Sequence, residues 1–115
     1  MNNIEELTQK IIKFRDERDW SQFHTPKNLA ISLSLEASEV LEHFQWKTDE
    51  EINEYITTHK EHIADELGDV FNYLLLLANR ADVDILKAAE NKLKKNEEKY
   101  PVDKAKGNAK KYNEL

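Results

Sequence analysis

Two pairs of acidic residues are the clearest candidates for chemistry in this sequence. Glu36 and Glu39 are three residues apart, and so are Glu66 and Asp69. Residues three apart in an α-helix are neighbours on its surface, so each pair would present two carboxylates side by side. Carboxylate oxygens suit hard divalent cations such as Mg²⁺, which also retains waters and phosphate oxygens as ligands. The pairs therefore indicate a cation site, although the same spacing is also common on solvated helix faces.

Both pairs interrupt apolar helix faces. The apolar rows are Leu29, Leu33, Val40 and Phe44 around Glu36, and Ile63, Val70 and Leu74 around Glu66. Carboxylates that converge between two helices repel each other and lose hydration, which is unfavourable unless a cation offsets their charge. A four-helix di-iron centre is the rival interpretation, but it needs Glu-x-x-His, and no histidine follows a glutamate at that spacing.

Long helices are needed to position these acids, and the composition agrees with them. Two glycines and two prolines are too few for the many turns of a β-sandwich or barrel. Apolar periodicity predicts helices over residues 4–20, 26–44, 61–81 and 83–100, with a short helical segment from Thr48 towards His59. We expect an all-α, four-helix-bundle-like domain over residues 1–101, with residues 102–115 as its polar tail.

Capping residues mark where these helices begin and end. Thr25 before Pro26 predicts an N-cap followed by proline at the first helical position. Thr48 and Glu51 have the spacing of a capping box, and Asp82 or Asp84 can cap the last long helix. Pro101 ends that helix, because its ring cannot continue it.

Charge and apolar content exclude several classes of protein. The net charge of −6 divides into −10 for residues 1–86 and +4 for residues 87–115. An acidic chain is a poor partner for nucleic acid polymers, whose affinity depends on neutralising phosphates. The longest apolar run, Tyr73 to Ala78, is far shorter than the about 20 residues of a membrane span. With no cysteine and no leader-like N-terminus, we expect a cytoplasmic protein without a membrane partner.

Short motifs that belong together occur in a fixed order along most of the chain. The motifs are Arg18-Asp19-Trp20, Phe23-His24, Pro26-Lys27-Asn28, Glu36 to Glu39, Phe44-Gln45-Trp46, Glu66 to Tyr73, Lys92 to Asn96, Lys99-Tyr100-Pro101 and the closing Lys111 to Leu115. Their joint order resembles the all-α nucleoside triphosphate pyrophosphohydrolases of the MazG superfamily, and is closest to the dCTP pyrophosphatase branch.

The resemblance implies an enzyme that hydrolyses nucleoside triphosphates, dCTP-like deoxynucleotides among them, to the monophosphate and pyrophosphate. Its cofactor would be Mg²⁺, with Mn²⁺ as a substitute. In the family the two acidic motifs bind the metal, which here means Glu36, Glu39, Glu66 and Asp69. One of these carboxylates, for which we favour Glu39, could orient the attacking water or take its proton.

The same resemblance suggests substrate-binding residues. Trp20 and Trp46 would enclose the base, with His24 at a base edge or sugar and Tyr73 at a phosphate or sugar. Lys92 and Asn96, one turn apart, would contact the phosphates. Without the resemblance, the aromatic residues fit equally well as core residues at the ends of a bundle.

The run Leu74 to Leu77 is apolar on several sides of its helix, which indicates burial in a bundle centre or a subunit interface. We expect a homo-oligomer, because one small bundle is too small to cover this run, and the family suggests a tetramer built as a dimer of dimers. The alternative is a non-catalytic helical oligomer that uses the fold as an interaction module, with its acids on the surface or in an interface.

Overall fold

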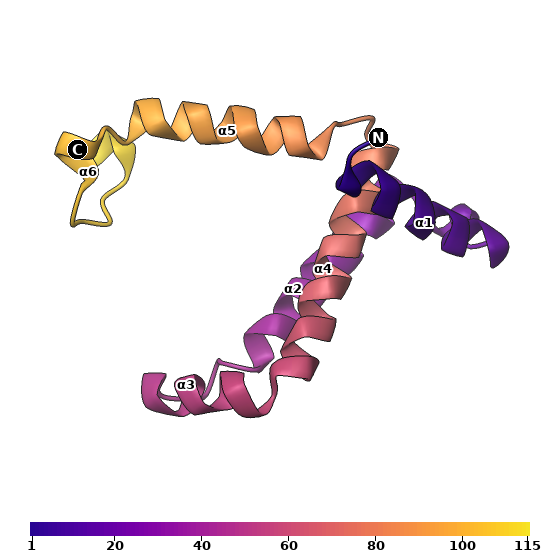
Figure 1. Cartoon of the computed structure of the whole chain (residues 1–115), viewed down its shortest axis with the longest axis horizontal. Coiled ribbons are helices and arrows are strands. Elements are labelled where there is room, and N and C mark those ends of the chain that lie inside the picture. Colours follow the sequence, from indigo (N-terminus) through magenta and orange to yellow (C-terminus); the bar gives the residue numbers. More distant parts are fainter. The chain divides into compact units, whose positions relative to one another are not determined.

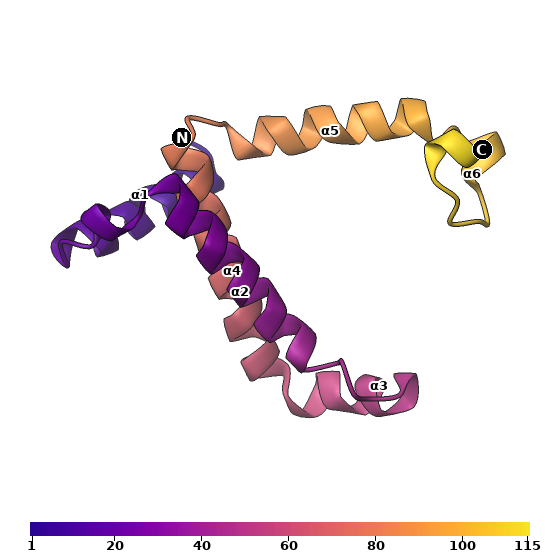
Figure 2. The same ribbon diagram turned by 180° about the vertical axis from the view of Figure 1, so that it is seen from behind.

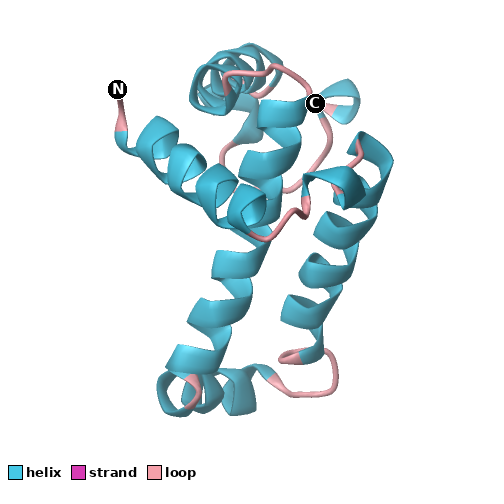
Figure 3. Ribbon diagram, turned by 90° about the vertical axis from the view of Figure 1, so that its right-hand side faces the viewer, coloured by secondary structure: helices cyan, strands magenta, loops and turns pink.

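The computed structural model covers residues 1–115 and is built entirely from helices and loops, which confirms the all-α prediction (Figure 3). The chain divides into two compact units, Met1–Asp82 and Val83–Leu115. The elements of the first unit are α1 (Asn3–Glu17), a 3₁₀ turn (Ser21–Phe23), α2 (Pro26–Glu42), α3 (Asp49–Thr58) and α4 (Lys60–Arg80); those of the second are α5 (Ile85–Lys99), α6 (Val102–Ala105) and a second 3₁₀ turn (Tyr112–Glu114). No helix is both long enough and apolar enough to cross a membrane.

The predicted helix starts are confirmed by their capping bonds. The Thr25 hydroxyl accepts a hydrogen bond from the Asn28 amide at 3.2 Å, directly before Pro26 in the first helical turn. Thr48 and Glu51 form both bonds of a capping box at the start of α3. Each such cap satisfies an amide that has no partner inside the helix.

The first predicted helix was too long, since α1 ends at Glu17 rather than Trp20. Asp19 has a φ of 55°, which takes the backbone out of the helix, and the Trp20 amide turns back to donate to the Arg15 carbonyl. Asp82 similarly has a φ of 56°, and Asp84 provides the N-cap of α5. An aspartate tolerates this left-handed conformation better than most residues do.

In the first unit, α2 and α4 run antiparallel and side by side, which both face-on views show (Figures 1 and 2). The α1 helix packs across α4 near its C-terminal end, and α3 connects the far ends of the α2–α4 pair. The buried residues are Leu29, Leu75, Leu76 and Ala78, of which Leu29 and Leu75 are fully buried. This core fixes the register of α2 against α4.

The leucine run is therefore not the uncovered surface that we expected. Leu75 is 1% exposed and Leu76 5% exposed within one chain, because α2 and α1 both pack on this half of α4. Large apolar residues are exposed elsewhere, including Leu35, Leu41, Leu67 and Trp46.

The second unit consists of α5 and a short return of the chain. Tyr112 meets Tyr100 edge to face at 6.3 Å between ring centroids, and the Lys99 ammonium lies 4.8 Å from the Tyr112 ring centre. The predicted polar tail thus contains two short helical turns, α6 and the second 3₁₀ turn.

Candidate active site

The antiparallel pairing of α2 and α4 brings the two predicted acidic pairs together. We call Glu36, Glu39, Glu66 and Asp69 the carboxylate cluster. Its electrostatic effect is visible at Glu36, whose pKa rises from 4.5 to about 7. Burial is the largest cause, followed by a hydrogen bond and the charge from Glu39, and then by the charges of Asp69 and Glu66.

The carboxylate cluster supplies the kind of ligand that a hard cation needs. Glu36 Oε2 is buried and has no hydrogen-bond partner. A buried carboxylate oxygen without a donor is unfavourable unless a cation or water meets it. In their present positions no three acidic or histidine side chains are arranged to hold a metal ion. Glu39 and Asp69 are exposed, however, so their side chains have room to turn towards one.

Histidine 43 joins the carboxylate cluster from α2, a contact that the sequence analysis did not predict. Its Nε2 lies 2.6 Å from Glu66 Oε2, and its Nδ1 is hydrogen-bonded to the Tyr55 hydroxyl of α3. His43 stands seven residues after Glu36, two helical turns along the same face of α2. That spacing is the signal that could have revealed it.

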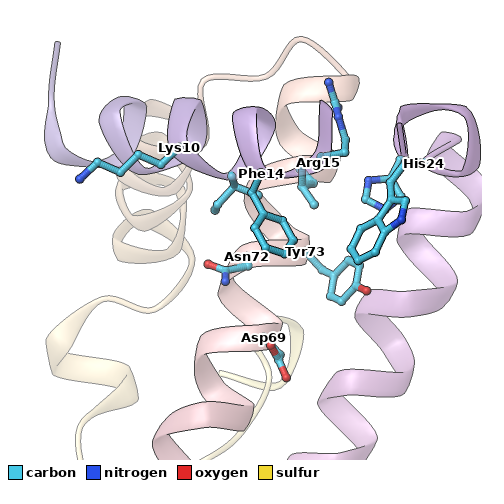
Figure 4. Close-up of a pocket in the computed structure, with 10 residues that line it drawn as sticks. Lys10, Phe14, Arg15, His24, Asp69, Asn72 and Tyr73 are labelled. Carbon is cyan, nitrogen blue, oxygen red and sulfur yellow. The ribbon is translucent and has the colours of Figure 1, made fainter. Parts of the chain in front are cut away.

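A cavity of about 330 Å³ lies in the first unit beside the carboxylate cluster. We call it the aromatic cavity. It is formed by α1, the segment between α1 and α2, and α4, and its lining residues are Lys10, Ile11, Phe14, Arg15, Trp20, His24, Asp69, Asn72, Tyr73 and Leu76. Figure 4 shows Phe14 and Tyr73 pointing into the space between these elements, whereas the Lys10 ammonium extends away from it.

The walls of the aromatic cavity combine ring faces with one free polar atom. Trp20 and Phe14 meet edge to face at 5.7 Å between ring centroids. His24 Nδ1 is buried without a hydrogen-bond partner. Burial, and secondarily the Arg15 charge, lower the pKa of His24, so its imidazole is neutral at pH 7. Such a site can stack a flat ring and offer it one hydrogen bond.

Asp69 belongs to both the carboxylate cluster and the wall of the aromatic cavity. Tyr73 lies one helical turn further along α4, on the same wall. A ligand that fills the cavity therefore has carboxylates at one end of it.

Other predicted residues lie outside this arrangement. Trp20 precedes α2 and Trp46 follows it, and the 17 residues of α2 span about 25 Å. Trp46 is 87% exposed and does not line the aromatic cavity. Lys92 and Asn96 lie one turn apart on α5, in the second unit.

Several cavity residues were not predicted as site residues. The cavity residues Phe14, Arg15, Lys10 and Asn72 received no role in the prediction. Asn72 is three residues after Asp69, so it shares a face of α4 with a predicted ligand. The spacing could have revealed Asn72. The cavity residues of α1 could not be found in this way, because their position depends on how α1 packs on α4.

Comparison with known proteins shows the family of this chain. Residues 31–115 match the model of the MazG-like family. The chain is 41% identical over 114 residues to dCTP pyrophosphatase 1 of Rattus norvegicus, covering 97% of this chain and 67% of the rat protein. The human protein of the same name is 40% identical over 114 residues, with the same coverage of both chains.

A solved structure also resembles the fold. A pyrophosphatase from Archaeoglobus fulgidus superposes with a TM-score of 0.83 and 42% sequence identity, over 88% of this chain and 94% of that one. The family model covers all four residues of the carboxylate cluster. On these grounds, the chain belongs to the MazG-like family.

Proposed function

We propose that this protein hydrolyses nucleoside triphosphates to the monophosphate and pyrophosphate, with dCTP-like deoxynucleotides as its substrate class. The observation that carries the proposal is the shared position of Asp69, which joins a cavity suited to a flat ring to a cluster of carboxylates. Relatives that are dCTP pyrophosphatases, and a structural neighbour that is a pyrophosphatase, support the same reaction.

The aromatic cavity would hold the base. Trp20 and Phe14 supply ring faces, and the neutral His24 offers a ring nitrogen that has no partner within the chain. Stacking on aromatic side chains stabilises a nucleobase, and a single hydrogen bond at its edge gives some selectivity. The Tyr73 hydroxyl would contact the sugar or the first phosphate, because Tyr73 lines the cavity one helical turn from Asp69.

The carboxylate cluster would hold Mg²⁺, or Mn²⁺ in its place, through Glu36, Glu39, Glu66 and Asp69. When bound, the ion would neutralise charge along the triphosphate and lower the pKa of a water in contact with it. Glu39 is the exposed member of the acidic pair on α2 and would orient the attacking water or accept its proton. The unpartnered Glu36 Oε2 supports the cation proposal, because an ion would satisfy it.

The substrate contacts of Lys92, Asn96 and Trp46 are also part of the proposal. Lys92 and Asn96 would bind the β- and γ-phosphates, since an ammonium and an amide both donate to anionic oxygens.

Trp46 lies at the opposite end of α2 from Trp20, so it would contact only a nucleotide that is bound by another copy of the chain. We therefore propose a homo-oligomer, a tetramer built as a dimer of dimers, in which the exposed apolar residues are covered.

A pyrophosphate-release assay over the common nucleoside and deoxynucleoside triphosphates tests this function. We expect release with Mg²⁺ present, with dCTP among the best substrates, and none with a chelator. Asp69→Asn should abolish release, since it removes one negative charge from the carboxylate cluster while keeping the shape of the side chain. Asp65→Asn is the matched control, because Asp65 is an exposed acid of the same helix and should be dispensable. Equal activity of the two variants would contradict the proposal.

A further inference from the structure

Two further polar side chains, His43 and Tyr55, connect Glu66 of the carboxylate cluster to α3. His43 Nε2 is 2.6 Å from Glu66 Oε2, and each of these two atoms is buried with no hydrogen-bond partner apart from the other. On the other side of the imidazole, Nδ1 meets the Tyr55 hydroxyl. The His43 side chain is only 12% exposed and that of Glu66 29% exposed.

The hydrogen-bonding capacity of these groups determines which atom carries each proton. An ionised carboxylate is only an acceptor, so the proton shared with Glu66 must sit on His43 Nε2. In a neutral imidazole the other nitrogen is then an acceptor, and the Tyr55 hydroxyl donates to it. The result is a directed chain in which Tyr55 donates to His43 and His43 donates to Glu66.

Tyr55 is itself held in place from several sides. Its ring stacks on His59 with centroids 4.1 Å apart and planes 9° from parallel. The Lys47 ammonium lies 4.2 Å from the centre of the Tyr55 ring and also donates to the His43 carbonyl at 2.8 Å. Phe44 meets the same ring edge to face. The hydroxyl therefore has little freedom to leave His43.

This arrangement occupies one oxygen of Glu66 and leaves the other without a protein donor. Partners of this kind hold a metal-binding carboxylate in one orientation, and removing them typically lowers metal affinity by about 10- to 100-fold. Glu66 is also the member of the carboxylate cluster that contacts a histidine. Its orientation is thus fixed before any cation arrives.

We propose that His43 and Tyr55 are positioning residues for the cation site, holding Glu66 through Oε2 so that Oε1 remains available to the ion. In this view α3 does more than connect α2 to α4, because it supplies the hydroxyl that orients the histidine. The inference rests on the cation site of the proposed function.

Calorimetric titration of the full chain with Mn²⁺, together with its melting temperature in chelator, tests the proposal. His43→Leu should bind Mn²⁺ about 10-fold more weakly or worse. His43→Gln should restore most of the affinity, because its amide nitrogen can donate to Glu66 as Nε2 does. Tyr55→Phe keeps the ring contacts, so a smaller loss in the same direction is expected even if His43→Leu folds poorly. His62→Leu is the control, since His62 is an exposed histidine of α4 and should leave affinity unchanged.

Three outcomes would overturn the proposal. They are unchanged Mn²⁺ affinity in His43→Leu or Tyr55→Phe, a folded His43→Gln as weak as His43→Leu, and a wild-type chain that binds no Mn²⁺. The last would also remove the cation site of the proposed function. By contrast, a wild-type chain whose Mn²⁺ affinity depends on His43 and Tyr55 but that releases no pyrophosphate would leave the positioning role standing and overturn the catalytic one.

Discussion

Glu36 is the residue whose surroundings change its chemistry most. Burial and three neighbouring carboxylates raise its pKa to about 7, so at neutral pH a large share of the metal-free protein carries a proton there. The proton partly relieves the repulsion that a cation would otherwise offset. Cation binding should therefore compete with this proton and strengthen as the pH rises from 6 to 8.

The shift at Glu36 predicts how metal-free stability depends on pH. Because its folded pKa lies above the unfolded value of 4.5, the folded chain binds more protons than the unfolded chain between pH 4.5 and about 7. The contribution of Glu36 to stability is thus present at low pH and lost as the pH rises through this window. Glu36→Gln should raise the melting temperature at pH 8 in chelator and flatten its fall with pH.

Melting curves in chelator from pH 4.5 to 8 give this measurement. Glu42→Gln is the matched control, because Glu42 is an exposed acid of the same helix and should retain the wild-type slope. If the melting temperature changes with pH by the same slope in Glu36→Gln and Glu42→Gln, the neighbouring carboxylates do not raise the pKa of Glu36.

The aromatic cavity makes a second prediction for single residues. Trp20→Ala should raise KM for dCTP with a smaller effect on kcat, because the indole contacts the base and not the reacting phosphate. Base stacking is worth about 1–3 kcal/mol, which corresponds to roughly 5- to 150-fold in KM if KM follows binding. Lys13→Ala is the control, since Lys13 is an exposed residue of α1 that does not line the cavity. A large fall in kcat with unchanged KM would contradict the placement of the base.

At the scale of elements, the sequence predicted helix starts better than helix contacts. Thr25 with Pro26, and Thr48 with Glu51, are local signals that depend on a few neighbouring residues, and both caps are present. The end of α1 was missed, because the turn at Asp19 depends on a left-handed aspartate that no periodicity indicates.

Contacts between helices were harder to predict. The acidic pairs were identifiable because each is local to one helix, but the meeting of His43 with Glu66 depends on the register of α2 against α4. The leucine run was misjudged for the same reason, since its burial depends on where α1 and α2 pack. Spacing along one helix gives the face of a residue and not its partner on another helix.

A substitution at Gly68 tests whether another part of the protein packs closely against α4 at this position. A Cβ added at Gly68 would meet nothing within 4 Å in the chain, so close packing within one chain does not explain the glycine. Gly68→Ala should raise the free energy of unfolding by about 1 kcal/mol, because alanine favours the helix interior. Ala64→Gly, at an exposed position one turn earlier, should lower it by a similar amount. Chemical denaturation measures both, and a loss of stability in Gly68→Ala would mean that another chain approaches α4 closely there.

At the scale of the whole molecule, four buried side chains are a small core for 115 residues. Leu35 is 60% exposed, Leu41 56% and Trp46 87%, all on or beside α2. Exposed apolar residues in such number are typical of interaction surfaces. The apolar surface left by one chain therefore favours assembly over a free monomer.

Light scattering at micromolar concentration measures the assembly directly. We expect a mass of four chains, with Trp46→Ala raising KM as Trp20→Ala does, because a second copy would bring Trp46 to the base. A monomer mass together with wild-type KM in Trp46→Ala would contradict both the assembly and the shared site.

The central claim is that water attacks a nucleoside triphosphate held between the aromatic cavity and the carboxylate cluster, so that pyrophosphate leaves as one unit. Mass spectrometry of the products formed from dCTP in ¹⁸O-enriched water, with Mg²⁺, tests it most directly. With the base at Trp20 and Asp69 beside the first phosphate, attack at the α-phosphorus places the label in dCMP, and pyrophosphate stays unlabelled. Label in pyrophosphate, or dCDP with orthophosphate as products, would contradict the account.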